Sequence, residues 1–410
     1  MSSSKHIVVA GAGYGGLLCA LELKKQLKNK ITVTLIDRHD YQLFTFDLYE
    51  AATADEEFVP SEKLKAGITL PLGPLLKGKK VDFLQAEIKE IDINSKNILA
   101  GGKRVNFDYL ILAAGSTSDD FGITGAELAL PLKTYPDALR LRNQIEFAFQ
   151  AHSLDYTKKN LRFVVAGGGY TGCELAAELV ELKNLLCWKY NYPLEKVEVA
   201  VVEAANSLIP GFSKRLSRDT YLRLKALGAE VRLSSPILQV TPQYVELNSG
   251  ERLTYDAAVW TVGVKANKLN IHPSPEADKR NRLSVNEFLQ VKGHNNVFAL
   301  GDVAAVLDKS GRPVPCSAQD AIAQAEYLIK ALPEIMQNRR PAPYAPESHG
   351  FIVALGGRWA IMDYKGVYLK GFLAYFIREL AHINYLRKIM GWLKAVNRVW
   401  FQFEIFGRND

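Results

Sequence analysis

One pattern occurs twice in this chain and constrains its fold more than any other feature. Each copy is an apolar strand, a glycine-rich turn, a helix, a second apolar strand and an acidic residue, first over residues 5–37 and again over residues 161–203. Such a βαβ unit points the N–H groups and the positive dipole end of its helix at the turn, where a phosphate is favoured. The repeat predicts an α/β chain with two Rossmann-like dinucleotide-binding domains.

The glycines in both turns have the spacing G-x-G-x-x-G. The first glycine permits the tight turn, the second lets a pyrophosphate approach the backbone, and the third lets the helix pack on the strand. The acid that ends the second strand is placed to accept a hydrogen bond from a ribose hydroxyl. Because a single copy is often only structural, the prediction of two bound dinucleotides depends on the repeat. The predicted cofactor-binding residues are Gly11, Gly13, Gly16, Asp37 and Arg38 in the first copy, and Gly167, Gly169, Gly172 and Glu203 in the second.

Three further apolar strands end in glycine. Residues 108–116 contain Gly115, residues 255–263 end at Gly263, and residues 296–300 precede Gly301 and Asp302. Each glycine is also compatible with an ordinary turn, and Asp302 with either a cofactor hydroxyl or an N-cap. The distance between the two copies fits one unit inserted in the other. We therefore expect residues 1–120 and 266–345 to form the first domain, 121–265 the second, and 346–410 a separate C-terminal segment.

The C-terminal segment combines basic charge with amphipathic periodicity. The chain has a net charge of +7, and residues 365–408 hold eight basic and two acidic side chains. Apolar residues recur at helical steps over residues 373–393, with Gly391 as a possible division into two helices. No run is long enough to span a bilayer. The pattern favours an interfacial helix on anionic lipid, with docking on the protein's own core or on a second subunit as the alternative. Nothing resembles a nucleic-acid-binding module.

The cysteines exclude several classes of protein. The chain has four, which are scattered and form no Cys-x-x-Cys pair. This number is too small for a disulfide framework, and the spacing is wrong for structural zinc, so we expect no metal site and a reducing compartment. The apolar run after Met1 is too short for a signal peptide, so we expect a chain that stays on the cytosolic side.

Taken together, these residues resemble the flavoprotein oxidoreductases that bind two dinucleotides. Residues 49–53, 167–176, 208–210 and 318–321 are similar to the type II NADH:quinone oxidoreductases, whereas the redox cysteine pair of the disulfide reductases is absent. The resemblance implies FAD on the first unit, NADH on the second and a quinone as the electron acceptor. It further implies a peripheral enzyme on the cytoplasmic face of the cell membrane, a homodimer, and no proton pumping. It assigns catalytic roles to Glu174, Gln319 and Arg378, and cofactor contacts to Glu174, Gly115, Gly263, Gly301, Asp302, Ala318 and Gln319.

One departure leaves alternatives open. The family pattern Ala-Gln-x-Ala-x-Gln would require glutamine at 323, but the chain has Ala323 followed by Gln324. One residue turns a helical side chain by about 100°, so Gln324 is not an equivalent replacement. A sulfide:quinone oxidoreductase is the first alternative, with Cys316 and Cys173 as its candidate cysteines. A nucleotide-sensing flavoprotein with little turnover is the second.

Overall fold

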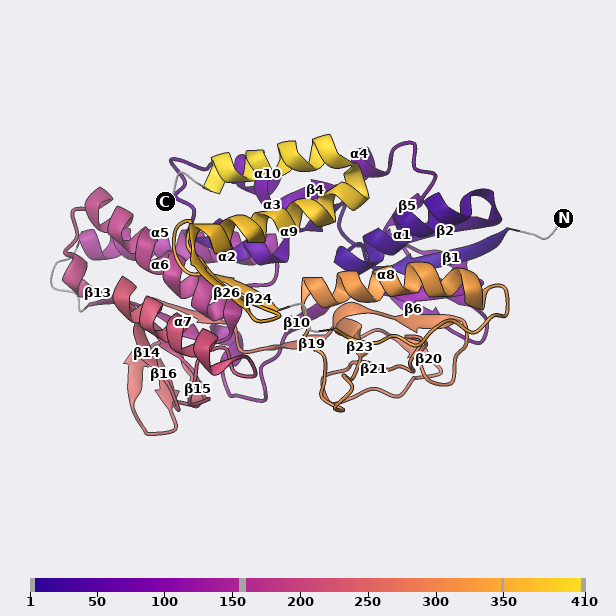
Figure 1. Cartoon of the computed structure of the whole chain (residues 1–410). Coiled ribbons are helices and arrows are strands. Elements are labelled where there is room, and N and C mark those ends of the chain that lie inside the picture. The colour runs from indigo at the N-terminus through magenta and orange to yellow at the C-terminus, as the bar shows by residue number, and fades with distance from the viewer. Residues whose placement is uncertain (1–3, 155–159, 348–349, 407–410) are drawn as a thin grey trace.

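Two five-stranded parallel sheets of the same construction form the framework of the computed structural model, which describes residues 4–154, 160–347 and 350–406. Their orders are β22-β9-β1-β2-β5 and β11-β18-β12-β13-β14. Figure 1 shows the first sheet at one end of the molecule and the second at the other. The strands are β1 Lys5–Ala10, β2 Ile31–Asp37, β5 Asp82–Gln85, β9 Tyr109–Leu112 and β22 Val297–Ala299, and β11 Leu130–Pro131, β12 Leu161–Ala166, β13 Val197–Val202, β14 Glu230–Arg232 and β18 Ala257–Trp260.

Each sheet is covered on both faces, which explains its continuous apolar strands. Along β1, Ile7 and Val9 pack with the helices α1 Tyr14–Leu27 and α8 Ala318–Ile335, whereas Val8 packs against a small sheet on the opposite face. In the second unit, Phe163 packs with the helices, and Val164 packs with another small sheet. The covering elements are β6 Ile88–Asp92, β7 Asn97–Ala100, β8 Lys103–Asn106 and β20 Ile271–His272 in the first unit, and α5 Tyr135–Ser153, α6 Tyr170–Lys189, α7 Lys214–Leu227, β15 Ile237–Val240, β16 Tyr244–Leu247 and β17 Arg252–Thr254 in the second.

The chain passes between the two units twice, and the two crossings pair with each other. β10 Ser116–Ser118 and β19 Val264–Ala266 form an antiparallel ladder. They directly follow Gly115 and Gly263, which have φ values of +68° and +76° that favour glycine. Asn267 fixes the first crossing, because its side-chain amide donates to the Ala114 carbonyl at 2.7 Å. The crossings lie close to the predicted domain limits at 120 and 265, and the division into domains stays a prediction.

The C-terminal segment is a small antiparallel sheet followed by two helices. The sheet consists of β24 Phe351–Ala354, β25 Ala360–Tyr364 and β26 Val367–Gly371, and the helices are α9 Phe372–Met390 and α10 Trp392–Phe406. Gly391, with φ +87°, separates the helices, so the predicted division is confirmed. Figure 1 shows α9 and α10 along one side of the molecule, with α10 beside α3 Ser61–Ile68. Arg408 of the basic segment lies outside the described residues.

The second and the third glycine of each G-x-G-x-x-G turn differ in the space around them. A Cβ on Gly16 would stand 2.0 Å from the Gly11 carbonyl oxygen, and a Cβ on Gly172 would stand 2.0 Å from that of Gly167. A Cβ on Gly13 or Gly169 would meet nothing within 4 Å. The third glycine of each motif therefore serves the fold, while the second leaves open space above the turn.

We predict opposite effects of alanine at two positions of the second turn. Gly172→Ala should lower the free energy of unfolding by about 1–3 kcal/mol, because the new Cβ overlaps a backbone carbonyl. Gly169→Ala should change it by less than about 0.5 kcal/mol. Urea unfolding without added nucleotide measures both, and equal losses would contradict the assignment.

Candidate functional site

The acid at the end of each second strand is bonded to the glycine turn beside it. Asp37 Oδ2 accepts the Ala12 N–H at 2.7 Å, and Glu203 Oε2 accepts the Gly168 N–H at 2.6 Å. The second oxygen of Glu203 accepts the Ala205 N–H at 2.7 Å. Both carboxylates are thus held in one position by the backbone, which reduces the entropy that a ligand must overcome on binding.

The two turns fit dinucleotides by their shape and their donors. The space above Gly13 and Gly169 is open, and α1 and α6 each begin at the next residue, so their free N–H groups face that space. Arg38 is exposed beside Asp37. Alanines at positions 204 and 205 supply no cation beside Glu203, so the second site suits a free ribose hydroxyl rather than a 2′-phosphate.

A second polar group lies where the chain crosses between the units. Ser116 of β10 bonds Asp302 Oδ2 at 2.5 Å, and the ammonium of Lys133 donates to Ser116 Oγ at 3.2 Å. Asp302 belongs to the single turn η5 Gly301–Val303, which packs on the start of α8. Gly301, Asp302, Ala318 and Gln319 therefore lie in one region, as the resemblance implies for residues of one cofactor site. Lys133 was not predicted, because a lone lysine after a short strand carries no sequence signal.

The structure explains the shifted glutamine. Gln324 is 2% exposed and its Oε1 accepts the Gly301 N–H at 2.7 Å, whereas Gln319 is exposed on the first turn of α8. Gln324 thus holds α8 against the η5 turn. This agrees with the prediction that it does not take the place of a glutamine at 323.

Glu174 is buried between α6 and β24. The helix α6 begins at Tyr170, so Glu174 opens its second turn. Its Oε1 accepts the Ala354 N–H of β24 at 3.4 Å. Burial raises the pKa of Glu174 to about 8, against the lowering effects of the Arg378 charge and of the Ala354 N–H. Glu174 is therefore mostly protonated at neutral pH.

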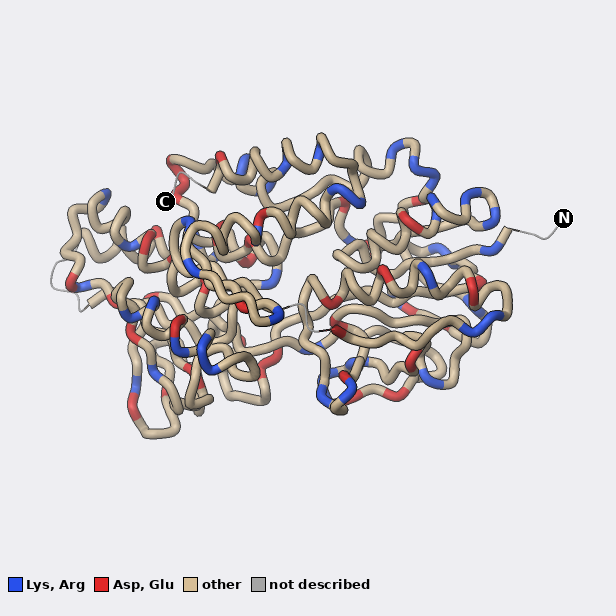
Figure 2. The backbone as a smooth tube through the Cα atoms, viewed as in Figure 1, with Lys and Arg blue, Asp and Glu red and all other residues tan. Residues whose placement is uncertain are grey.

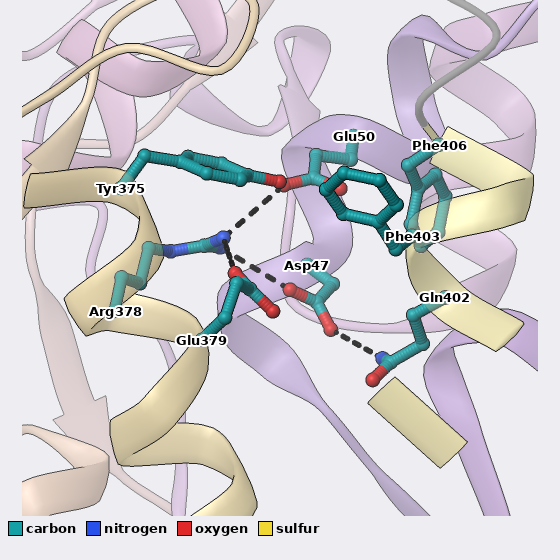
Figure 3. Close-up of a pocket in the computed structure, with 8 residues that line it drawn as sticks. All are labelled: Asp47, Glu50, Tyr375, Arg378, Glu379, Gln402, Phe403 and Phe406. Carbon is teal, nitrogen blue, oxygen red and sulfur yellow. Dashed lines mark hydrogen bonds and ion pairs between the residues drawn. The ribbon is translucent and has the colours of Figure 1, made fainter. Parts of the chain in front are cut away.

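Arg378 is the centre of a carboxylate cluster on the inner face of α9. Its guanidinium lies 3.2 Å from Asp47, 3.4 Å from Glu50 and 2.8 Å from Glu379, and its side chain is 12% exposed. Figure 3 shows these carboxylates around the guanidinium, with Gln402 of α10 on the far side of Asp47. The cavity among them measures about 10 Å³, room for one water molecule. Because carboxylates enclose its guanidinium, Arg378 is unsuited to bind a lipid headgroup.

The candidate cysteines do not form a pair. All four cysteines are free thiols. Cys173 is fully buried at the start of α6, with its Sγ 3.4 Å from the Gly168 carbonyl. Burial raises the pKa of Cys316 to about 11, so at neutral pH it is a thiol and a weak nucleophile.

The helices α9 and α10 expose eight large apolar side chains, together with polar and charged ones such as Asn384 and Lys394. No described helix is both long and hydrophobic enough to cross a bilayer. The eight large apolar side chains are Phe372, Leu373, Phe376, Leu380, Trp392, Leu393, Val396 and Trp400.

Two lysines of the basic C-terminal segment form ion pairs with residues of other elements. Lys370 pairs with Asp219, and Lys388 pairs with Glu326. Figure 2 shows basic residues near the start of α10 and along the connection between α4 Leu72–Leu76 and β5. Lys394 of α10 is exposed, as is Arg387 near the end of α9. The connection itself carries Lys77, Lys79 and Lys80, three exposed lysines that the sequence pattern did not indicate.

Comparisons with known proteins agree with this geometry. The pyridine nucleotide-disulphide oxidoreductase family matches residues 5–325. Type II NADH:quinone oxidoreductases of Staphylococcus haemolyticus and Staphylococcus aureus are 31% and 30% identical to this chain, over 94% of it and 96% of theirs. The structure of NDH2 from Plasmodium falciparum in complex with NADH matches with a TM-score of 0.84 at 20% identity, covering 98% of this chain and 97% of that one.

A sulfide:quinone oxidoreductase from Aquifex aeolicus shares the fold with a lower TM-score of 0.76 at 20% identity, over 94% of this chain and 91% of that one. A structural match at 20% sequence identity shows a common fold alone. The two staphylococcal relatives are instead 31% and 30% identical to this chain over nearly its whole length. The chain belongs to the type II NADH:quinone oxidoreductase family.

Proposed function

We propose that this protein oxidises NADH through a bound FAD and passes the two electrons to a membrane quinone, without proton pumping. The observation that carries the proposal is the pair of equivalent glycine–acid turns, on two units joined by crossings that contain Ser116 and lie beside Asp302. When bound, FAD supplies the chemistry by accepting a hydride and returning its two electrons to a second acceptor. The chain supplies orientation and charge.

The first unit holds FAD in this proposal. Its turn receives the pyrophosphate at the start of α1, and Asp37 accepts from the ribose, with Arg38 beside it. The residues assigned to the remainder of the cofactor are Gly115, Gly301, Asp302, Ala318 and Gln319. The bond from Gly301 to Gln324 supports this assignment, because it fixes the turn that carries Asp302.

The second unit holds NADH by the same physical means. Gly167, Gly169 and Gly172 form the turn, Glu203 accepts from the adenine ribose, and Gly263 ends the strand beside it. The negative charge of Glu203 repels a 2′-phosphate, which selects NADH over NADPH.

Glu174 and Arg378 are the proposed groups on the acceptor side. The Ala354 N–H occupies Glu174 Oε1, so the other oxygen, Oε2, carries the proton that a reduced quinone needs. The guanidinium of Arg378 lowers the pKa of Glu174 and keeps it near neutrality. Gln319, on the first turn of α8, is the third proposed catalytic residue.

The exposed apolar side chains of α9 and α10 form the proposed membrane surface. Tryptophans at its edge and the lysines of residues 77–80 suit the headgroup region of anionic lipid. Such docking on the cytoplasmic face of the cell membrane would bring a lipid-dissolved quinone to the side of α9. The homodimer implied by the resemblance stays a prediction.

Stopped-flow mixing of the flavin-loaded protein tests the relay. NADH should bleach the flavin absorbance, NADPH should do so about 100-fold more slowly because of Glu203, and a soluble quinone should restore it. Bleaching by sulfide alone would support the sulfide enzyme, and slow bleaching without recovery by quinone would support the sensing flavoprotein.

The protonation of Glu174 makes the rate of flavin reoxidation by quinone depend on pH. Because the pKa of the buried carboxyl is raised to about 8, its proton is present below that pH and lost above it. The rate of flavin reoxidation by quinone should therefore fall as pH rises through about 8, which gives the pH–rate profile a falling limb near that pH. Glu174→Gln should remove this pH limb, while flavin reduction by NADH persists. An unchanged limb in Glu174→Gln would assign the titration to another group.

Vesicle sedimentation tests the membrane surface. Trp392→Ser combined with Leu393→Ser should lower partitioning onto phosphatidylglycerol vesicles by about tenfold or more, since each side chain is more than 60% exposed and contributes apolar area. Leu238→Ser, at an equally exposed site on β15, is the matched control. Equal partitioning of both variants would place the docking surface elsewhere.

A further inference from the structure

Asp47 occupies a helix N-cap position without capping its helix. It ends the turn η2 Thr45–Asp47 and directly precedes the helix α2 Leu48–Thr53. Aspartate at such a position normally accepts an N–H of the first turn. Here the side chain makes no cap bond, and the residue is 4% exposed. Its carboxylate is directed instead at the C-terminal helices.

The two oxygens of Asp47 hold two different helices. Oδ1 accepts from Arg378 of α9 at 3.2 Å, and Oδ2 accepts from the amide of Gln402 on α10 at 2.9 Å. The same amide donates to the Gly67 carbonyl at 3.0 Å. One buried carboxylate of the first unit therefore fixes both helices that follow the small antiparallel sheet.

Arg378 links Asp47 to the surroundings of Glu174. Glu174 accepts the Ala354 N–H of β24, and α9, which carries Arg378, packs against β24. In keeping with this packing, the Arg378 charge lowers the pKa of Glu174. Five elements supply the charged and titratable groups of the region. Those around Asp47 are Tyr14, Glu50, Arg378, Glu379 and Arg398, and those around Glu174 are Tyr49, Glu50, Tyr170, Cys173, Glu178 and Arg378. Arg378 and Glu50 belong to both groups.

We propose that Asp47 is a positioning residue for the quinone half-reaction, because it fixes the guanidinium of Arg378 and, with it, the electrostatic environment of Glu174. This inference rests on the proposed function of Arg378 and Glu174. Asp47 itself does not touch substrate. Its side-chain hydrogen bonds to Arg378 and Gln402 run to α9 and α10 and not to a glycine turn, so we expect its effect on the acceptor side.

Asp47→Ala in the flavin-loaded protein is the test. Reoxidation of reduced flavin by quinone should slow by about tenfold, as small displacements of a catalytic group can produce, while reduction by NADH should stay within about twofold. With Arg378 displaced, the pKa of Glu174 should rise, and the pH limb near 8 should move upward by about one unit. Hydrogen exchange of α10 should increase, with and without flavin.

Two further variants test whether Asp47 acts by positioning Arg378 or by its charge and its contribution to stability. Asp47→Asn keeps an acceptor for Arg378, and Gln402 can turn its own unpaired Oε1 to the new amide, so most of the quinone rate should return. Glu326→Gln removes another carboxylate that holds α9, the partner of Lys388, and should leave both half-reactions within about twofold. If Asp47→Ala does not fold, Gln402→Ala should slow the quinone step and move the limb in the same direction.

The inference is overturned if Asp47→Ala, or in its place Gln402→Ala, leaves the quinone rate and the pH limb unchanged. It is equally overturned if Asp47→Asn loses as much as Asp47→Ala, or if both half-reactions fall together. A wild-type protein whose flavin is not reduced by NADH, or not reoxidised by quinone, would instead contradict the proposed function.

Discussion

The structure depends on how closely helix and strand approach at each glycine turn. The carbonyl of the first glycine occupies the place where the third residue would carry a Cβ, 2.0 Å away in both units. Only glycine allows this approach, and it brings the turn within reach of the acid on the neighbouring strand. Asp37 and Glu203 then each accept an N–H from the turn that they serve. The same short segment thus sets the packing of the sheet, the direction of the helix and the position of the ribose acceptor.

The two sides of the C-terminal helices differ in chemistry. The inner face of α9 carries Arg378, surrounded by carboxylates, whereas the exposed sides of α9 and α10 carry large apolar side chains. A buried arginine with several carboxylates around it is weak evidence for stability, because removing each charge from water is costly. Its place beside Glu174 suggests that the cluster is kept for electrostatic control.

Local patterns in the sequence predicted most of the framework. The strand–turn–helix units depend on neighbouring residues, and Gly391 ends α9 because its φ of +87° suits glycine. The same reasoning explains why Gln324 lies on another face of α8 than residue 323. These features follow from helical periodicity and from the backbone conformations that glycine allows, and both can be read from neighbouring residues in one sequence.

Contacts between distant residues could not be predicted in this way. Asp47 has the sequence context of an N-cap, and its real partners are more than 300 positions away. The sequence gives the net charge of the basic segment. It could not reveal that Asp219 and Glu326 form ion pairs with two of the segment's lysines. The resemblance indicated Glu174 and Arg378, but their contacts with Ala354 and Asp47 needed the structure.

In the proposed function, the two equivalent turns each hold one dinucleotide. A crystal structure of the protein with FAD and NAD⁺ would test it most directly. We predict one adenine ribose against Asp37 and the other against Glu203, with a pyrophosphate above Gly13 and Gly169 respectively. A dinucleotide bound at only one turn, or a ribose that contacts neither acid, would contradict the claim.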